Sequence, residues 1–223
     1  MDSKRFANYD KYSYLFPPRP VNTTHFTQLG IYDNGQFIAQ PKYNGTCCNV
    51  FISKTELVVM NRHKRNITSN YSEIDLKGLH KGDGWLVLCG EFLNKNKKGE
   101  EGKPFNLKFV IWDILVYDSK YLLGSTFSER MALLEQLYPC VKMVVGKELN
   151  SLSHLCFTNY KNCYKAPCYE YGFDVLYNSI VDTDLYEGLV LKRKDAKLSY
   201  GLTERNNSDW QIKCRKPTKN YDF

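Results

Sequence analysis

The sequence lacks the features that would place the chain in a membrane or outside the cell. No stretch approaches the roughly 18 apolar residues that a membrane-spanning helix needs. The N-terminal segment MDSKRFANYDKY mixes acidic and basic residues around no apolar core, so we expect no signal peptide. Eight cysteines are present, without the spacing of a disulfide framework. We therefore expect reduced thiols, an intracellular, cytoplasmic location (the host cytoplasm if the chain is viral) and no membrane partner.

Internal repeats, low-complexity tracts and a convincing interdomain linker are also missing. The 223 residues, 43% of them hydrophobic and 14% aromatic, are enough to bury one sizeable core. We expect a single domain over 1–223 that begins with an irregular lead-in of about 1–30 and works as a monomer. The net charge of +7 suits a polyanionic partner such as nucleic acid, although many basic proteins bind none.

Short β-rich segments dominate the chain and predict its strands. The expected strands are Gln36–Pro41, Thr46–Ile52, Glu56–Met60, Trp85–Phe92, Lys108–Leu115, Leu189–Leu191 and Trp210–Cys214. The Lys- and Gly-rich stretch NKNKKGEEGKP between the fourth and fifth strands predicts a long mobile hairpin loop. Ser128–Leu137 has apolar residues at helical spacing behind Ser128, a candidate N-cap. The mixture indicates an α+β fold with two mainly antiparallel sheets and flanking helices.

One cluster of metal-ligand residue types has two interpretations. His154, Cys156, Cys163 and Cys168 lie close together in HLCFTNYKNCYKAPC. Zinc uses such ligands, but the tight CxxC pairs of most structural zinc sites are missing. Buried free thiols are the favoured interpretation, and zinc stays the alternative.

Lys42 is the candidate nucleophile. It ends an expected strand in AQPKYNG, where Gly45 permits a tight turn into the next strand. A KxxG pattern by itself is more often a solvated turn lysine. Five further segments add weight. Their candidate residues are Arg62 in MNRHKR, Glu91 in LCGEFL, Trp112 and Asp113 in FVIWDIL, Glu187 and Lys192 in EGLVLK, and Lys213 and Arg215 in WQIKCRKP.

The last of these segments has a pattern of its own. Lys213 and Arg215 alternate, so on a strand both point to the same face. A free lysine, with a pKa of about 10.4, is almost entirely protonated at neutral pH and is then no nucleophile. Two cations beside Lys42 would favour its neutral amine and would also stabilise negative charge on a phosphate.

In order and in local pattern, the segments from about Gln40 to Lys216 resemble the motifs of the covalent nucleotidyltransferase superfamily. Its members are the ATP-dependent DNA ligases, the RNA ligases and the mRNA capping guanylyltransferases. The resemblance implies a ligase-type, ATP-grasp-like nucleotidyltransferase domain, with ATP and Mg²⁺ (or Mn²⁺) as cofactors. The chain ends eight residues after Arg215, so we expect no OB-fold. The chain would then be either a bare catalytic core or a compact enzyme such as a viral or phage ligase.

The resemblance also implies a role for each candidate residue. Lys42 would capture AMP with help from Lys213 and Arg215, and Glu187 would position the metal ion. The nucleotide would be held by Gln40 at the base edge, Trp112 on the base, Arg62 and Glu91 at the ribose, and Lys192 at the phosphates. Simpler alternatives exist for these residues. Glu91 and Asp113 could be acids that cap strand ends, and Trp112 could be part of the hydrophobic core. Lys192 could belong to a solvated KRK face, and Lys213 and Arg215 could form only a basic rim.

The segments also bear on which family member the chain is similar to. The stretch from Trp112 to Leu134 resembles the segment after the third motif of DNA ligases, whereas KYNGT is similar to RNA ligases. We expect an ATP-dependent polynucleotide ligase that joins 5′-phosphate and 3′-hydroxyl ends of nicked or broken nucleic acid, with DNA favoured narrowly over RNA. A GTP-dependent capping guanylyltransferase is the first alternative. A catalytically silent nucleic-acid-binding module is the second, because Asn44 stands where most members have Asp.

Overall fold

The computed structural model describes residues 19–71, 73–93, 107–144, 154–182, 185–199 and 207–217. Its strands are β1 (Arg19–Thr23), β2 (Phe37–Tyr43), β3 (Thr46–Ile52), β4 (Leu57–Asn61), β5 (Leu86–Leu93), β6 (Lys108–Tyr117), β7 (Lys120–Tyr121), β8 (Lys142–Val144), β9 (Leu155–Phe157), β10 (Cys163–Lys165), β11 (Tyr186–Arg193) and β12 (Asn207–Arg215). The α-helices are α1 (Leu29–Tyr32), α2 (Phe127–Leu137) and α3 (Phe173–Ile180), and the short 3-10 helices are η2 (Phe26–Gln28), η3 (Thr68–Tyr71) and η4 (Lys77–Leu79).

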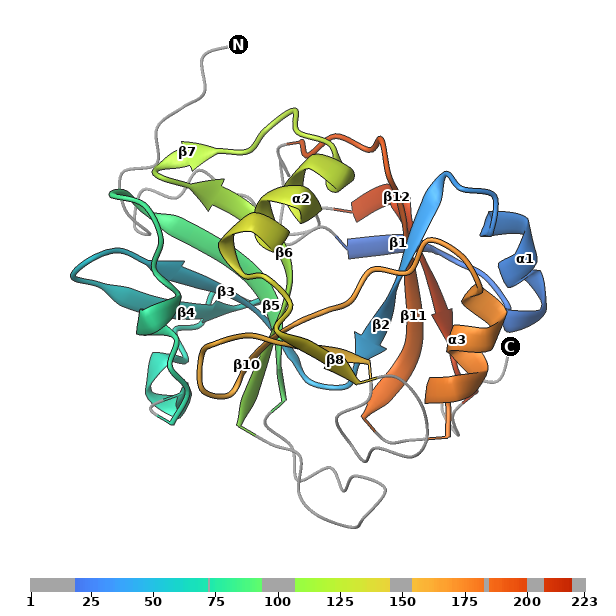
Figure 1. Ribbon diagram of the computed structural model, residues 1–223, viewed down its shortest axis with the longest axis horizontal. Coiled ribbons are helices and arrows are strands. Elements are labelled where there is room, and N and C mark those ends of the chain that lie inside the picture. The colour runs from blue at the N-terminus through green and yellow to red at the C-terminus, as the bar shows by residue number, and fades with distance from the viewer. Residues whose placement is uncertain are drawn as a thin grey trace.

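The strands form two sheets. A four-stranded sheet has the order β1-β12-β11-β2, and an eight-stranded sheet has the order β4-β3-β5-β6-β10-β9-β8, with β7 paired to β6. All strand pairs are antiparallel except β1 with β12 and β6 with β10. In Figure 1 the two sheets lie side by side, with α1 and α3 on the outer side of the smaller one. The expected α+β architecture is confirmed.

The central strands β5 and β6 are buried along most of their length because each sheet face has its own core. Leu86, Leu88 and Ile111 belong to a cluster on one face, whereas Val87 and Leu115 belong to a second cluster on the other. This two-sided burial explains why LVLC and FVIW are nearly continuous apolar runs. A third cluster packs α3 against the four-stranded sheet.

Helix α2 begins one residue earlier than expected. The expected N-cap, Ser128, was wrong: Thr126 caps the helix, because its side chain accepts a hydrogen bond from the Glu129 backbone N–H at 3.2 Å. The Glu129 carboxylate in turn accepts the Thr126 backbone N–H at 2.7 Å. The pair is a capping box, whose signature is a Thr followed three residues later by Glu.

The lead-in of about 1–30 is less irregular than expected. Its described part contains β1, which pairs in parallel with β12, and then η2 and α1. Strands β8 to β10 and helix α3 were not expected either. The NKNKKGEEGKP loop falls outside the described residues. No helix within the described ranges is long and apolar enough to cross a membrane.

Candidate active site

The register of β2, β11 and β12 brings the candidate nucleophile and the two candidate cations together. Lys42 pairs with Gly188, which in turn pairs with Arg215. One step along the strands, Gln40 and Lys213 lie opposite the same β11 residue. Residues directly opposite each other share a face of the sheet. Lys42, Gln40, Lys213 and Arg215 therefore lie on one face, and the residues that pack on α3 lie on the other.

Glu187 completes a cluster of charges around Lys42. The Lys42 Nζ forms an ion pair with Glu187 Oε2, and the Arg215 guanidinium lies 3.9 Å from the same oxygen. Burial lowers the pKa of Lys213, and the positive charges of Arg215 and Lys42 lower it further. The Lys42 side chain is 21% exposed. The site thus holds a reachable amine among cations that attract a phosphate.

A backbone irregularity in β11 places Glu187. The register with β2 shifts between Tyr186 and Gly188, and this bulge turns the Glu187 carboxylate to Lys42. Gly188 has φ +127°, and a Cβ there would lie 2.0 Å from the Cys214 carbonyl oxygen. Since a side chain cannot be fitted at this position, the geometry requires the glycine of EGLVLK.

Glu91 fixes the turn that follows Lys42. Its Oε1 accepts the Gly45 backbone N–H at 3.1 Å. A Cβ at Gly45 would lie 2.4 Å from the Phe92 carbonyl oxygen, so this close approach also needs glycine. Burial raises the pKa of Glu91 to about 7, even though the charge of Lys42 lowers it. The Glu91 carboxyl group therefore holds the turn that follows Lys42, and its role at the ribose stays a prediction.

The raised pKa of Glu91 predicts a pH-dependent stability. The folded protein holds this proton up to about pH 7, whereas the unfolded chain loses it near pH 4.5, so the group makes stability fall as the pH rises between these values. Glu91→Gln keeps an acceptor for Gly45 but does not titrate. Relative to wild type, we expect the variant to gain about 2 kcal/mol between pH 5 and pH 8, measured by urea unfolding. A stability difference independent of pH would contradict this explanation.

Arg62 is the candidate that lies furthest from direct contact with the cluster. It is exposed in the turn after β4, and its Nε donates to the His63 Nε2 at 3.0 Å. Its charge still lowers the pKa of Glu91 slightly, as the last of the influences on that carboxyl. The Arg62 charge is therefore near enough to act on Glu91, and its contact with a ribose stays a prediction.

Lys192 lies deep between the sheets. It is 2% exposed, and its ammonium lies 4.5 Å from the ring centroid of Trp112 and 4.8 Å from that of Phe127. Burial lowers the pKa of Lys192 to about 8. The alternative of a solvated KRK face is thus wrong for this residue. Trp112 is half-buried and packs against two of the clusters, so its ring lies where the sheets meet.

Asp113 has a structural partner that motif comparison did not identify. Arg130 of α2 donates to both Asp113 oxygens, from Nε at 2.8 Å and from the guanidinium at 3.0 Å, and both side chains are fully buried. A further Arg130 N–H donates to the Ser125 carbonyl at 2.9 Å. The sequence feature that could have indicated this pair is an acid within an apolar strand, followed by an arginine in the next helix. This pair docks α2 against β6 behind Trp112.

Gln40 is buried, with 2% of its surface exposed. Its Nε2 lies 3.4 Å from Cys168 Sγ and 3.7 Å from Met131 Sδ. Its Oε1 is buried without a hydrogen-bond partner among the described residues. A buried, unpaired amide oxygen is costly and suits a site that a ligand completes. Asn44, in the turn after Lys42, donates its backbone N–H to the Leu185 carbonyl at 2.9 Å.

The candidate zinc ligands are dispersed in the structure. His154 uses both ring nitrogens in hydrogen bonds, with the Tyr169 hydroxyl at 2.8 Å and the Ser179 hydroxyl at 3.1 Å. Within the described ranges, no group of three or more His, Cys, Asp or Glu residues is placed to hold a metal ion. All eight cysteines are free thiols.

Comparisons with known proteins agree with this architecture. No family profile matches the chain. The multifunctional non-homologous end joining DNA repair protein LigD of Mycobacterium tuberculosis is 25% identical over 138 residues, which are 58% of this chain and 18% of that protein. The chain thus matches less than a fifth of its curated relative's length.

Two solved structures share the fold. The ligase domain of M. tuberculosis LigD has a TM-score of 0.62 at 20% identity, covering 92% of this chain and 60% of that one. A mycobacterial DNA ligase D complexed with ATP has a TM-score of 0.56 at 20% identity, covering 89% and 60%. The chain therefore has the ligase nucleotidyltransferase fold. The resemblance that its motifs indicate is confirmed at the level of the fold.

Proposed function

We propose that this chain is an ATP-dependent polynucleotide ligase that carries AMP on Lys42 and seals 5′-phosphate and 3′-hydroxyl ends. The observation that carries the proposal is the strand register, which places Lys42 beside Lys213 and Arg215 on one face of the four-stranded sheet, with Glu187 ion-paired to the Lys42 amine. The structural likeness to a DNA ligase D complexed with ATP supports the choice of nucleotide.

The charge cluster fits the first chemical step. The Lys42 amine, having lost a proton, attacks the α-phosphorus of ATP; an N–P bond forms, and the bond to the leaving pyrophosphate oxygen breaks. Lys213 and Arg215 lie on the same face and stabilise the negative charge on the phosphate oxygens during transfer. A 5′-phosphate oxygen then attacks the same phosphorus and releases Lys42, and a 3′-hydroxyl finally displaces AMP.

A divalent cation fits the site through Glu187. Mg²⁺ commonly binds through one or two carboxylates together with substrate phosphates and water, so a single carboxylate beside the phosphate site is sufficient. When bound, Mg²⁺ (or Mn²⁺) neutralises phosphate oxygens. Glu187 would hold it, and loss of the ion pair to this carboxylate would release the Lys42 amine.

The surroundings of the Gln40 amide suit an adenine base. As the amide is placed, the unpaired Gln40 Oε1 requires a donor, which the exocyclic amine of adenine provides and the O6 of guanine does not. We propose that the Trp112 ring stacks on the base and that Glu91 and Arg62 hold the ribose. We propose that Lys192, beside Trp112, reaches the phosphates or base only by leaving its buried position.

The partner we propose is nicked or broken nucleic acid, with DNA favoured narrowly over RNA. The name of the LigD relative refers to DNA repair, and the net charge of +7 suits a phosphate backbone. The eight free thiols suit a reducing, intracellular compartment. The monomeric state stays a prediction.

The test is covalent labelling followed by sealing. The protein is incubated with Mg²⁺ and with ATP or GTP labelled at the α-phosphate, resolved on a denaturing gel, and then given nicked all-DNA, all-RNA and hybrid duplexes. We expect label from ATP and sealing of DNA nicks at least as fast as RNA nicks. Label from GTP alone would indicate a capping enzyme. No label from either nucleotide, with nucleic acid still bound, would indicate a silent binding module.

A further inference from the structure

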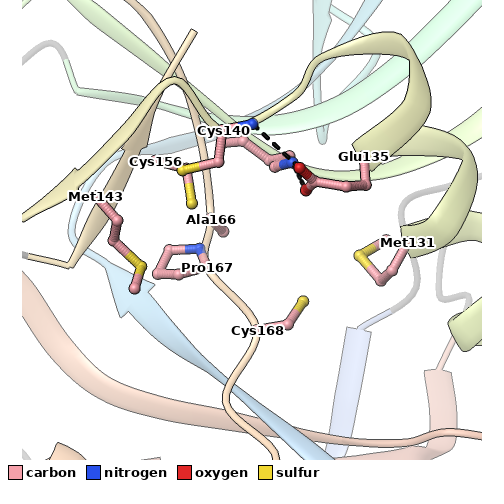
Figure 2. A pocket seen from close by; sticks show the side chains of 9 residues that line it. Met131, Glu135, Cys140, Met143, Cys156, Ala166, Pro167 and Cys168 are labelled. Atoms are coloured by element: carbon pink, nitrogen blue, oxygen red, sulfur yellow. Dashed lines mark hydrogen bonds and ion pairs between the residues drawn. The ribbon is translucent and has the colours of Figure 1, made fainter.

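A cavity lies next to the Gln40 side chain. It has a volume of about 290 Å³ and lies between α2, β8, β9 and the segment after β10 (Figure 2). Five sulfur-containing side chains line it, those of Met131, Cys140, Met143, Cys156 and Cys168. The ion pair of Lys165 with Glu135 forms part of another wall. The cavity is thus an apolar, polarisable space with one charged border.

Gln40 joins this cavity to the nucleotide site. Two of the lining residues, Met131 and Cys168, are the ones whose sulfur atoms contact the Gln40 Nε2. The other amide atom, Oε1, is buried and unpaired among the described residues. Gln40 also shares the sheet face of Lys42 two residues before it. A base that pairs with this amide therefore has its outer edge at the mouth of the cavity.

Resting on the proposed ligase function, we propose that the cavity receives an apolar substituent on the exocyclic amine of adenine. The enzyme then accepts N6-substituted ATP as well as ATP as its AMP donor. A secondary amine keeps one N–H for the Gln40 Oε1, and its substituent takes the place of the other hydrogen. The transfer itself is unchanged: the Lys42 N–P bond forms and pyrophosphate leaves.

The size and lining of the cavity suit an aromatic substituent. A cavity of about 150 Å³ is large enough to bind benzene, and this one has about 290 Å³. Thioether and thiol groups pack favourably against aromatic rings, and methionine adapts its shape to different partners. N6-benzyl-ATP is therefore the probe.

The experiment measures adenylylation of Lys42 with ATP and with N6-benzyl-ATP in three proteins. Met143→Trp fills the cavity from β8, where Met143 lines it and is 46% exposed. Val141→Trp adds the same ring two residues away, at a position that is 59% exposed and outside the lining. We expect wild type and Val141→Trp to use N6-benzyl-ATP within about tenfold of ATP in kcat/KM. In Met143→Trp, kcat/KM should fall by about tenfold or more with N6-benzyl-ATP and stay unchanged with ATP.

The outcomes separate this inference from the function on which it rests. Labelling by ATP without labelling by N6-benzyl-ATP would overturn the cavity proposal and leave the ligase proposal standing. Equal use of N6-benzyl-ATP by wild type and Met143→Trp would also overturn it, because the substituent would then lie elsewhere. No labelling by either nucleotide would overturn both proposals.

Discussion

Lys42→Ala should abolish formation of the covalent nucleotide adduct, by at least about a thousandfold in rate. The variant loses the atom that forms the N–P bond, and no other lysine shares its position between Glu187 and Arg215 in the described part of the site. Label retained after denaturation measures the adduct directly. Lys42→Arg is the companion variant: it keeps a positive charge beside Glu187 without a nucleophilic amine, so it should also fail to label.

An exposed lysine provides the matched control. Lys54, in the turn between β3 and β4, forms a surface ion pair with Asp83, so Lys54→Ala should label like wild type. Undiminished labelling of Lys42→Ala would place the nucleophile elsewhere. Labelling of Lys42→Arg with none in Lys42→Ala would mean that Lys42 acts as a charge and not as the nucleophile.

Breaking the buried pair of Asp113 with Arg130 should have the largest effect on stability. Both side chains are fully buried, and removal of one partner leaves an uncompensated charge in the core. We expect Asp113→Ala or Arg130→Met to lose about 3–5 kcal/mol in the free energy of unfolding, measured in urea. The double variant Asp113→Leu with Arg130→Met should recover most of that loss, because it leaves no buried charge.

Recovery in the double variant distinguishes two explanations of the pair. If the single variants are costly because of the stranded charge, the double variant is nearly as stable as wild type. If the double variant is as unstable as the single variants, the loss of stability arises because the pair is needed to position α2. A single variant that costs less than about 1 kcal/mol would contradict burial of the pair.

The sequence was most informative where contacts are local. Strands β2 to β6 each alternate or run apolar over about the expected length, so their existence could be predicted. The alternation of Lys213 with Arg215 correctly predicted a shared face. The turn at Gly45 could also be predicted from the glycine itself. The structure adds a second reason for glycine there, because a Cβ at Gly45 would lie 2.4 Å from the Phe92 carbonyl oxygen.

Contacts between distant segments could not be predicted. Strand β1 contains Pro20 and has no β pattern of its own, and it exists because β12 offers it an edge. Lys192 reads as part of a solvated KRK run, yet a strand register that begins at the Glu187 bulge turns it between Trp112 and Phe127. The contact of Gln40 with Cys168 joins residues 128 positions apart.

Intact-mass spectrometry of the protein after incubation with ATP and Mg²⁺ tests the central claim most directly. The account predicts that a fraction of the protein gains the mass of one AMP, that peptide mapping places this adduct on Lys42, and that added pyrophosphate removes it. A protein whose mass never changes, at high ATP or GTP and with Mg²⁺ or Mn²⁺ present, would contradict the account.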